Sequence, residues 1–236
     1  ERGKGIDLSA LKDQISKYGY DYIWETAGKQ LAIPNYCDYG RYLEGKGLLE
    51  EYRDFIKSPW ENDANLEFER EGGNCWPLDD NDYVDIVTGD KIVERIRNRP
   101  DNKPFYIFGS FCSPHKPFDP PQSYLDKVDY EETDDFIPGG LELTPENKDL
   151  LYRRRRSYKA MIKLVDDQIG RICDTLEEEG ILDDTVILFA SDHGDMLGDH
   201  ASTQKRLDPA GQKSLPWKQS LTVPLAIRHP DYLHNR

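Results

Sequence analysis

The chain has 236 residues and a formal net charge of −14, from 31 Lys and Arg against 45 Asp and Glu. This length allows a substantial core, and an aromatic content of 11% argues against a disordered chain in spite of the acidity. The charge disfavours a nucleic-acid backbone as the main partner, and no apolar stretch approaches the roughly 18 residues that a membrane span needs.

The first part of the chain, 1–100, is expected to form peripheral helices and loops. Short helical patches are expected at 8–18 and 48–56. A longer helix is expected over 83–97, where apolar residues recur at helical spacing, although Gly89 weakens the pattern.

The core elements are expected in 101–236. The apolar run 105–111 is typical of a buried strand, and a proline-rich loop follows it. A long amphipathic helix is expected from Thr144 to Gly180, with a good N-cap residue at its start and a glycine at its end.

Two further strands are expected after that helix. The run 185–190 is apolar and β-branched, which is typical of a central strand. The other strand is expected at 221–228, where Pro224 places it near an edge or an end.

Strand, polar loop, long helix and strand in this order indicate an α/β fold. In open α/β sheets, ligands bind beyond the carboxyl ends of the strands. The loops around His115 and Asp192 both follow predicted strands, so we expect them to meet at one rim of the sheet.

Asp192 and His193 are candidate metal ligands because a carboxylate and a neutral imidazole directly follow a rigid strand. The alternative is turn chemistry, in which Asp192 caps the next element and His193 forms a surface hydrogen bond. For a second acid–imidazole pair, Asp199 and His200, the turn interpretation is favoured.

His115 is held on the stiff loop, where it could donate a proton or a hydrogen bond to an anionic substrate. The alternative is a histidine packed against Phe118, and the local sequence favours neither. Four arginines at 153–156 point in almost every direction on a helix, so a solvated face is favoured over one anion-binding patch.

Four segments in series resemble the motifs of a known family. Residues 103–118 resemble a strand closed by an S-x-P-H-x-P-F loop, and 165–170 resemble a V-D-D-x-I-G helix motif. Residues 181–200 resemble L-x-D-N-T followed by S-D-H-G-D-M-L-G-D-H, and 216–224 are similar to P-W-E-E-S-x-R-V-P. On these motifs, the chain is identified as a member of the sulfatase branch of the alkaline-phosphatase superfamily.

The resemblance implies an α/β sandwich with a central, mostly parallel sheet flanked by helices, incomplete in this chain. It also implies hydrolysis of a sulfate ester, with a divalent cation, usually Ca²⁺, and a formylglycine hydrate as nucleophile. Asp192 and His193 match the second pair of metal ligands of the family. His115 matches the histidine that contacts the sulfate or the leaving group.

A lysine that binds the sulfate is also implied by the resemblance. Counting back from Trp217 selects Lys213, whereas counting forward from His200 selects Lys205. Lys213 is preferred because the family lysine lies four residues before that aromatic residue.

The sequence departs from the family pattern in two ways. His193 stands where many members have an amide, so Mn²⁺ and Zn²⁺ stay open beside Ca²⁺. The N-terminal Asp-Asp ligand pair and the C/S-x-P-x-R nucleophile motif are not found. Cys112 imitates that motif, but Lys116 replaces its arginine and the following prolines preclude the helix that the motif opens.

We therefore expect 1–236 to be an internal piece of a sulfatase catalytic domain, without its nucleophile and inactive alone. Two other functions stay open: a phosphonate monoester or phosphodiester hydrolase of the same fold, and a non-catalytic domain that binds a sulfated ligand. The expected partner is a small-molecule or glycan sulfate ester. Analogy with related sulfatases suggests a periplasmic or extracellular location, which no segment of the sequence supports by itself.

Overall fold

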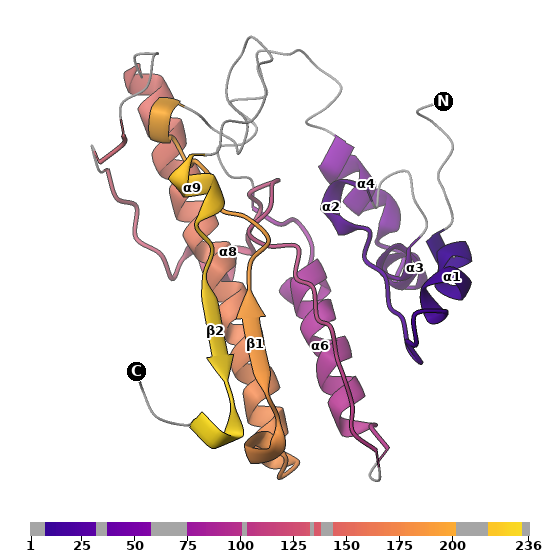
Figure 1. Ribbon diagram of the computed structural model, residues 1–236. Coiled ribbons are helices and arrows are strands. Elements are labelled where there is room, and N and C mark those ends of the chain that lie inside the picture. The colour runs from indigo at the N-terminus through magenta and orange to yellow at the C-terminus, as the bar shows by residue number, and fades with distance from the viewer. Residues whose placement is uncertain are drawn as a thin grey trace. The chain divides into compact units, whose positions relative to one another are not determined.

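The computed structural model (Figure 1) describes residues 8–31, 37–57, 75–100, 103–132, 135–137, 144–201 and 217–232. The chain divides into two compact units. The first unit comprises Glu1–Val128 and Ser157–Ile172, and the second comprises Asp129–Arg156 and Cys173–Arg236. A long helix, α8 (Pro145–Glu178), contributes residues to both.

The described part of the first unit is mostly helical. Besides the middle of α8, its helices are η1 (Leu8–Leu11), α1 (Lys12–Ser16), α2 (Gly28–Leu31), α3 (Asp38–Gly45), α4 (Leu49–Lys57), η3 (Asp80–Asp82), α6 (Val84–Arg97) and α7 (Gln122–Leu125). The helices predicted at 8–18, 48–56 and 83–97 are confirmed by η1 with α1, by α4 and by α6.

Aromatic side chains form much of the core of this unit. Tyr39 of α3, Tyr52 of α4, Trp76 and Tyr83 are each at most 6% exposed. The ring centroids of Tyr39 and Tyr52 lie 5.7 Å apart, and those of Trp76 and Tyr83 lie 5.2 Å apart, both edge to face. Such pairs contribute about 0.5–1.5 kcal/mol each beyond their buried area. The ring of Trp76 also lies 5.7 Å from that of Tyr52, so these contacts connect α3, α4 and the start of α6.

Helix α6 lies close to α8 at Gly89. The apolar positions that predicted α6 are all buried: Val84, Val87, Ile92, Val93 and Ile96. A Cβ atom on Gly89 would lie 2.5 Å from Oε1 and 3.3 Å from Cβ of Gln168, which belongs to α8. The glycine that weakens the helix prediction therefore makes room for the neighbouring helix.

Helix α8 confirms the predicted long helix, and Gly180 follows its end with a φ of 69°. Its buried stripe differs from the apolar face predicted from the helical spacing of Tyr158, Ile162, Val165, Ile169, Ile172 and Leu176. Ile162 is 48% exposed, whereas Ser157, Gln168 and Thr175 are buried. The spacing of apolar residues alone does not predict which side of α8 is buried, because polar side chains also lie on the buried side.

The second unit contains a two-stranded ladder of β1 (Ile187–Ala190) and β2 (Leu225–Arg228), seen side by side in Figure 1. Ile187 pairs with Arg228 and Ala190 pairs with Leu225, so the strands are antiparallel. Its short helices are η4 (Leu182–Asp184), η5 (Asp199–Ala201), α9 (Lys218–Leu221) and η6 (Pro230–Tyr232).

This ladder differs from the expected central, mostly parallel sheet. Among the described residues, β1 has β2 as its one neighbour, and the pair is antiparallel. The backbone N–H of Gly194 donates to the carbonyl oxygen of Ser220 at 2.8 Å. Ser220, which precedes β2, therefore lies next to the loop that follows β1. Because β2 begins near the carboxyl end of β1, it pairs with β1 in the antiparallel direction. The strands predicted near 185–190 and 221–228 do exist, with Pro224 directly before β2.

The expected buried strand at 105–111 is wrong for the described residues. This segment has no ladder partner among them, and Tyr106 and Phe108 are 73% and 71% exposed. A strand forms only where a neighbour accepts its backbone hydrogen bonds, and an apolar run does not reveal that neighbour. The segment does approach α6, because a Cβ atom on Gly109 would lie 2.5 Å from Cδ1 of Ile92.

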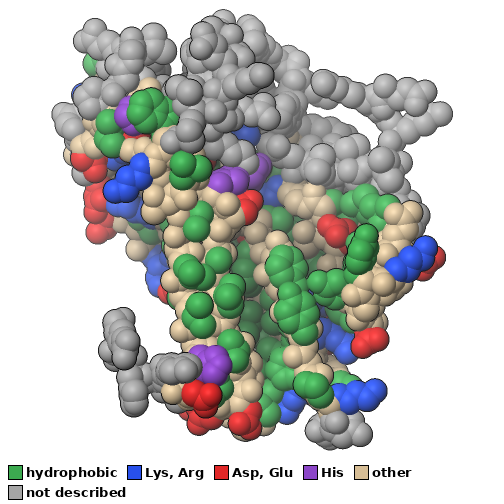
Figure 2. Space-filling model, in the orientation of Figure 1, with side chains coloured by type: hydrophobic (Ala, Val, Ile, Leu, Met, Phe, Trp, Pro, Cys, Tyr) green, Lys and Arg blue, Asp and Glu red, His purple; other side chains and the backbone are tan. Residues whose placement is uncertain are grey.

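One face of the β1–β2 ladder is apolar and exposed. Leu188 pairs with Ile227, and the two side chains are 65% and 60% exposed. Val186 and Leu225 lie on the same face and are 55% and 64% exposed. Figure 2 shows hydrophobic side chains over these two strands.

None of the described helices has both the length and the apolar character required to cross a bilayer.

Two glycine substitutions test the contact between α6 and α8. We expect Gly170→Ala to raise the free energy of unfolding by about 0.5–1 kcal/mol, because alanine favours helix and no atom lies within 4 Å of the added Cβ. Gly89→Ala should instead lower it, because the helix gain is outweighed by the clash with Gln168. Urea denaturation of both variants measures the difference, and equal gains would contradict the close packing.

Candidate metal-binding loop and histidine loop

The loop after β1 places Asp192 and His193 next to each other. His193 Nδ1 lies 2.7 Å from the carbonyl oxygen of Gly194, so Nδ1 carries a proton and Nε2 has the lone pair in the neutral ring. This Nε2 lies 3.7 Å from Oδ2 of Asp192, whose side chain is 86% exposed. One imidazole nitrogen and one carboxylate oxygen are therefore close enough to bind the same cation.

Gly194 holds this loop against α9. A Cβ atom on Gly194 would lie 1.9 Å from the carbonyl oxygen of Gln219 and 2.9 Å from that of Thr222. The backbones of the loop and of α9 therefore touch directly, and only glycine fits between them. Ser220 Oγ also lies 3.3 Å from Met196 Sδ, which adds a contact two residues further along the loop.

Asp195 is partly buried in the same loop. Burial raises the pKa of its carboxyl, while the backbone N–H of Leu197 and the guanidinium of Arg154 lower it. Arg154 is fully buried, so the expected solvated face at 153–156 is wrong for this residue. It lies one helical turn from buried Leu150, on the inner side of α8.

Asp199 and His200 stabilise the far end of the loop. Asp199 Oδ1 accepts the backbone N–H of Ile137 at 3.1 Å, and its Oδ2 accepts the side-chain amide of Gln219 at 3.0 Å. The ring of His200 stacks on Trp217 with centroids 3.7 Å apart. These contacts agree with the turn interpretation favoured for this pair.

Asp192 and His193 fit a divalent cation as part of its ligand shell. They offer a hard oxygen and a neutral nitrogen, and a backbone carbonyl orients the imidazole, as is usual for a metal-bound histidine. Across the described ranges, no three His, Cys, Asp or Glu side chains are grouped so as to hold an ion. The pair could therefore offer two ligands, and a full shell would need others.

His115 lies exposed on its loop in the first unit. Its backbone N–H donates to the carbonyl oxygen of Cys112 at 3.0 Å, and its Nδ1 lies 2.6 Å from that of Lys116. Nδ1 thus carries a proton, and Nε2 is the nitrogen that gains and loses one. The ring of Phe118, the alternative partner considered for His115, packs on Tyr158 with centroids 5.9 Å apart.

His115 belongs to the first unit, whereas Asp192 and His193 belong to the second. Their expected meeting at one rim stays a prediction. Lys213 and Lys205 lie outside the described residues.

A buried ion pair that no sequence motif indicates anchors the end of the His115 loop. Lys29 Nζ lies 2.5 Å from Oδ1 of Asp119, and the two side chains are 3% and 1% exposed. The same ammonium donates to the hydroxyl of Tyr83 at 2.5 Å and to the carbonyl oxygen of Pro117 at 3.3 Å. Burial raises the pKa of Asp119, and the charge of Lys29 lowers it.

Sequence patterns did not mark Lys29 or Asp119, because charged residues are normally assigned to the surface. Their burial becomes visible only when the segments around them are packed together. The one available signal was the position of Asp119 within the proline-rich loop.

The surroundings of Cys112 argue against a thiolate nucleophile at this position. Burial and the carboxylate of Asp85 raise the pKa of the thiol to about 12, although Lys29 lowers it. A nucleophilic cysteine needs a thiolate near neutral pH, and such sites have a depressed pKa.

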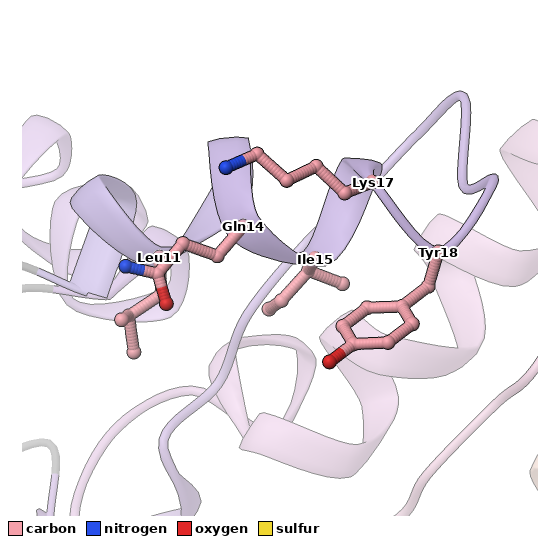
Figure 3. A pocket seen from close by; sticks show the side chains of 5 residues that line it. All are labelled: Leu11, Gln14, Ile15, Lys17 and Tyr18. Atoms are coloured by element: carbon pink, nitrogen blue, oxygen red, sulfur yellow. The ribbon is translucent and has the colours of Figure 1, made fainter.

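A surface pocket lies along η1 and α1, lined by Leu11, Gln14, Ile15, Lys17 and Tyr18 (Figure 3). It contains none of the predicted site residues.

Comparison with known proteins places the chain in a family. The family model described as Sulfatase matches residues 6–235. An arylsulfatase of Clostridium perfringens is 30% identical over 223 residues, which cover 84% of this chain and 45% of the relative. An endo-4-O-sulfatase of Bacteroides thetaiotaomicron is 29% identical, covering 67% of this chain and 31% of the relative.

Among solved structures, a phosphonate monoester hydrolase of Agrobacterium radiobacter has a similar fold. The TM-score is 0.64 with 21% identity, covering 82% of this chain and 42% of that one. This chain belongs to the sulfatase family, and it spans less than half the length of these relatives. The family generally uses a divalent metal ion and a formylglycine.

Gly194→Ala tests the contact between the loop and α9. We expect the free energy of unfolding to fall by about 1–3 kcal/mol, and binding of divalent cations to weaken, because the new Cβ must displace α9. Thermal unfolding and calorimetric titration with Ca²⁺ and Mn²⁺ measure the two effects. Gly170→Ala, in open surroundings, is the control. Unchanged stability and cation affinity would contradict the packing.

The raised pKa of Cys112 predicts slow alkylation. At about pH 8 only roughly one thiol in ten thousand is ionised, so the rate with iodoacetamide should rise about tenfold per pH unit up to about pH 10. Peptide mapping by mass spectrometry follows this residue separately from the other cysteines. A rate that levels off below about pH 9 would indicate an activated thiol and overturn the interpretation.

Proposed function

We propose that this chain carries part of the active site of a sulfuric ester hydrolase. Asp192 and His193 are the proposed metal ligands, and His115 and Lys213 are the proposed contacts to the sulfate ester. No residue of this chain is assigned as the nucleophile.

The loop after β1 is the observation that carries the proposal. Two different metal donors lie 3.7 Å apart, the imidazole is oriented by the Gly194 carbonyl, and the loop is braced by α9. Two donors, an oriented imidazole and a rigid support are the features that a metal site requires of its ligands.

His115 is the proposed proton donor to the leaving group. Its Nδ1 is engaged with the Lys116 carbonyl, so a proton on Nε2 can pass to the ester oxygen as the bond from that oxygen to sulfur breaks. Lys213 is assigned from its position in the family motif and would bind a sulfate oxygen through its charge.

The proposed cation is Ca²⁺, with Mn²⁺ and Zn²⁺ as alternatives because His193 supplies nitrogen rather than oxygen. When bound, the cation neutralises charge on the sulfate oxygens, and the formylglycine of the family supplies the attacking oxygen. Asp192 and His193 would hold the cation through a carboxylate oxygen and an imidazole nitrogen.

The proposed substrate is a small-molecule or glycan sulfate ester. The relatives described as an arylsulfatase and as an endo-4-O-sulfatase support this class. The net charge of −14 supports the exclusion of nucleic acid as the main partner.

A second candidate function is hydrolysis of a phosphonate monoester or a phosphodiester. It is favoured by the imidazole of His193, which suits Mn²⁺ or Zn²⁺, and by the likeness of the fold to a phosphonate monoester hydrolase.

The full-length protein should hydrolyse aryl sulfates faster than aryl phosphodiesters. Asp192→Ala and His193→Ala should each lower kcat/KM by about a hundredfold or more, since even residues that only orient a metal ligand are worth 10–100-fold. Asp184→Ala, which changes an exposed acid of η4, is the matched control and should retain activity.

Three other outcomes of this experiment would each favour a different interpretation. Full activity of Asp192→Ala would show that the ligand assignment is wrong. Faster turnover of the phosphodiester would favour the second candidate. Tight calorimetric binding of a sulfated glycan without turnover of either ester would favour a non-catalytic binding domain.

A further inference from the structure

Asp85 lies in the first turn of α6 and is fully buried. Its side chain binds the backbone of the His115 loop. Oδ1 accepts the backbone N–H of Cys112 at 2.5 Å, and Oδ2 accepts that of Ser113 at 3.0 Å. Hydrogen bonds to an ionised carboxylate are stronger than bonds between neutral groups, so one side chain fixes two consecutive peptide units.

These two peptide units lead directly to His115. The carbonyl oxygen of Cys112 accepts the backbone N–H of His115 at 3.0 Å. Asp85 therefore fixes the residue to which the backbone of His115 is bound. The imidazole is held close to this turn, because its Nδ1 donates to the carbonyl oxygen of the next residue, Lys116.

The other end of the loop has a separate anchor. Lys29 donates to the carbonyl oxygen of Pro117 and pairs with Asp119. The loop is thus held at both ends, and Asp85 is the group that holds the end before His115. A carboxylate in the first turn also favours α6 itself, so a test must separate positioning from a general effect on folding.

We propose that Asp85 is a positioning residue, which sets the direction of His115 for proton transfer to the leaving group through the N–H groups of Cys112 and Ser113. This inference rests on the function proposed above for His115.

The test compares two aryl sulfates in the full-length protein. Phenyl sulfate has a poor leaving group that needs protonation, whereas para-nitrophenyl sulfate has a good one that needs it less. Asp85→Asn replaces one acceptor oxygen with an NH₂ group, which cannot accept a hydrogen bond from the backbone N–H of Cys112 or Ser113. We expect its kcat for phenyl sulfate to fall at least about tenfold more than its kcat for the nitrophenyl ester.

Four further variants complete the comparison. His115→Ala should show the same selective loss, and Asp85→Asn combined with His115→Ala should be no more selective than His115→Ala alone, because both act on one proton transfer. Asp90→Asn changes an exposed acid of α6 that pairs with Arg171, and it should show no selectivity. If Asp85→Asn does not fold, Asp85→Glu keeps both acceptors but displaces them, and it should show the selective loss.

The outcomes separate this inference from the proposed function. Equal loss on both esters for the Asp85 variants, with selective loss for His115→Ala, would overturn the positioning role and leave the role of His115 intact. Absence of selective loss in His115→Ala would overturn the proton-donor role, and the inference with it. Selective losses that multiply in the double variant would show that Asp85 does not act through His115.

Discussion

The packing of the described first unit depends on the contacts that the buried ammonium group of Lys29 makes. This group brings together Asp119 from the proline-rich loop, Tyr83 from the start of α6 and the sulfur of Met161 from α8. A charge buried this deeply is costly unless its partners stay in place, and removal of one partner typically costs about 3–5 kcal/mol. The pair therefore restricts the loop to the arrangement in which Asp119 is buried, and His115 is carried by that same loop.

In both candidate loops the backbone is held in place, while the side chains of His115 and Asp192 are exposed and that of His193 is half-buried. In the second unit, Gly194 lets α9 touch the backbone beside His193, and the Gly194 carbonyl orients the ring. In the first unit, the backbone beside His115 is bound by the buried carboxylate of Asp85. A site residue is held in a defined position when the structure around it is rigid. In both loops, contacts to the backbone provide most of this rigidity.

Sequence patterns predicted the positions of helices and strands better than they predicted which segments pack against each other. Helix α6 and the position of β1 followed from local apolar spacing, and Asp192 and His193 follow a strand as expected. The direction and exposure of the strands did not follow, because they depend on which segments pair with them. Arg154, Lys29 and Asp85 were missed or misassigned for a related reason: their burial is decided by distant segments, whereas charge at one position suggests solvent.

The open face of the β1–β2 ladder has a consequence for the chain in solution. Leu188 and Ile227 offer apolar area that gains free energy when any similar surface covers it. Because hydrophobic attraction weakens on cooling and strengthens in sulfate salts, contact between such faces depends on temperature and salt type more than on net charge. Molecules of this acidic chain can thus repel one another electrostatically at long range and still attract one another through apolar contacts at short range.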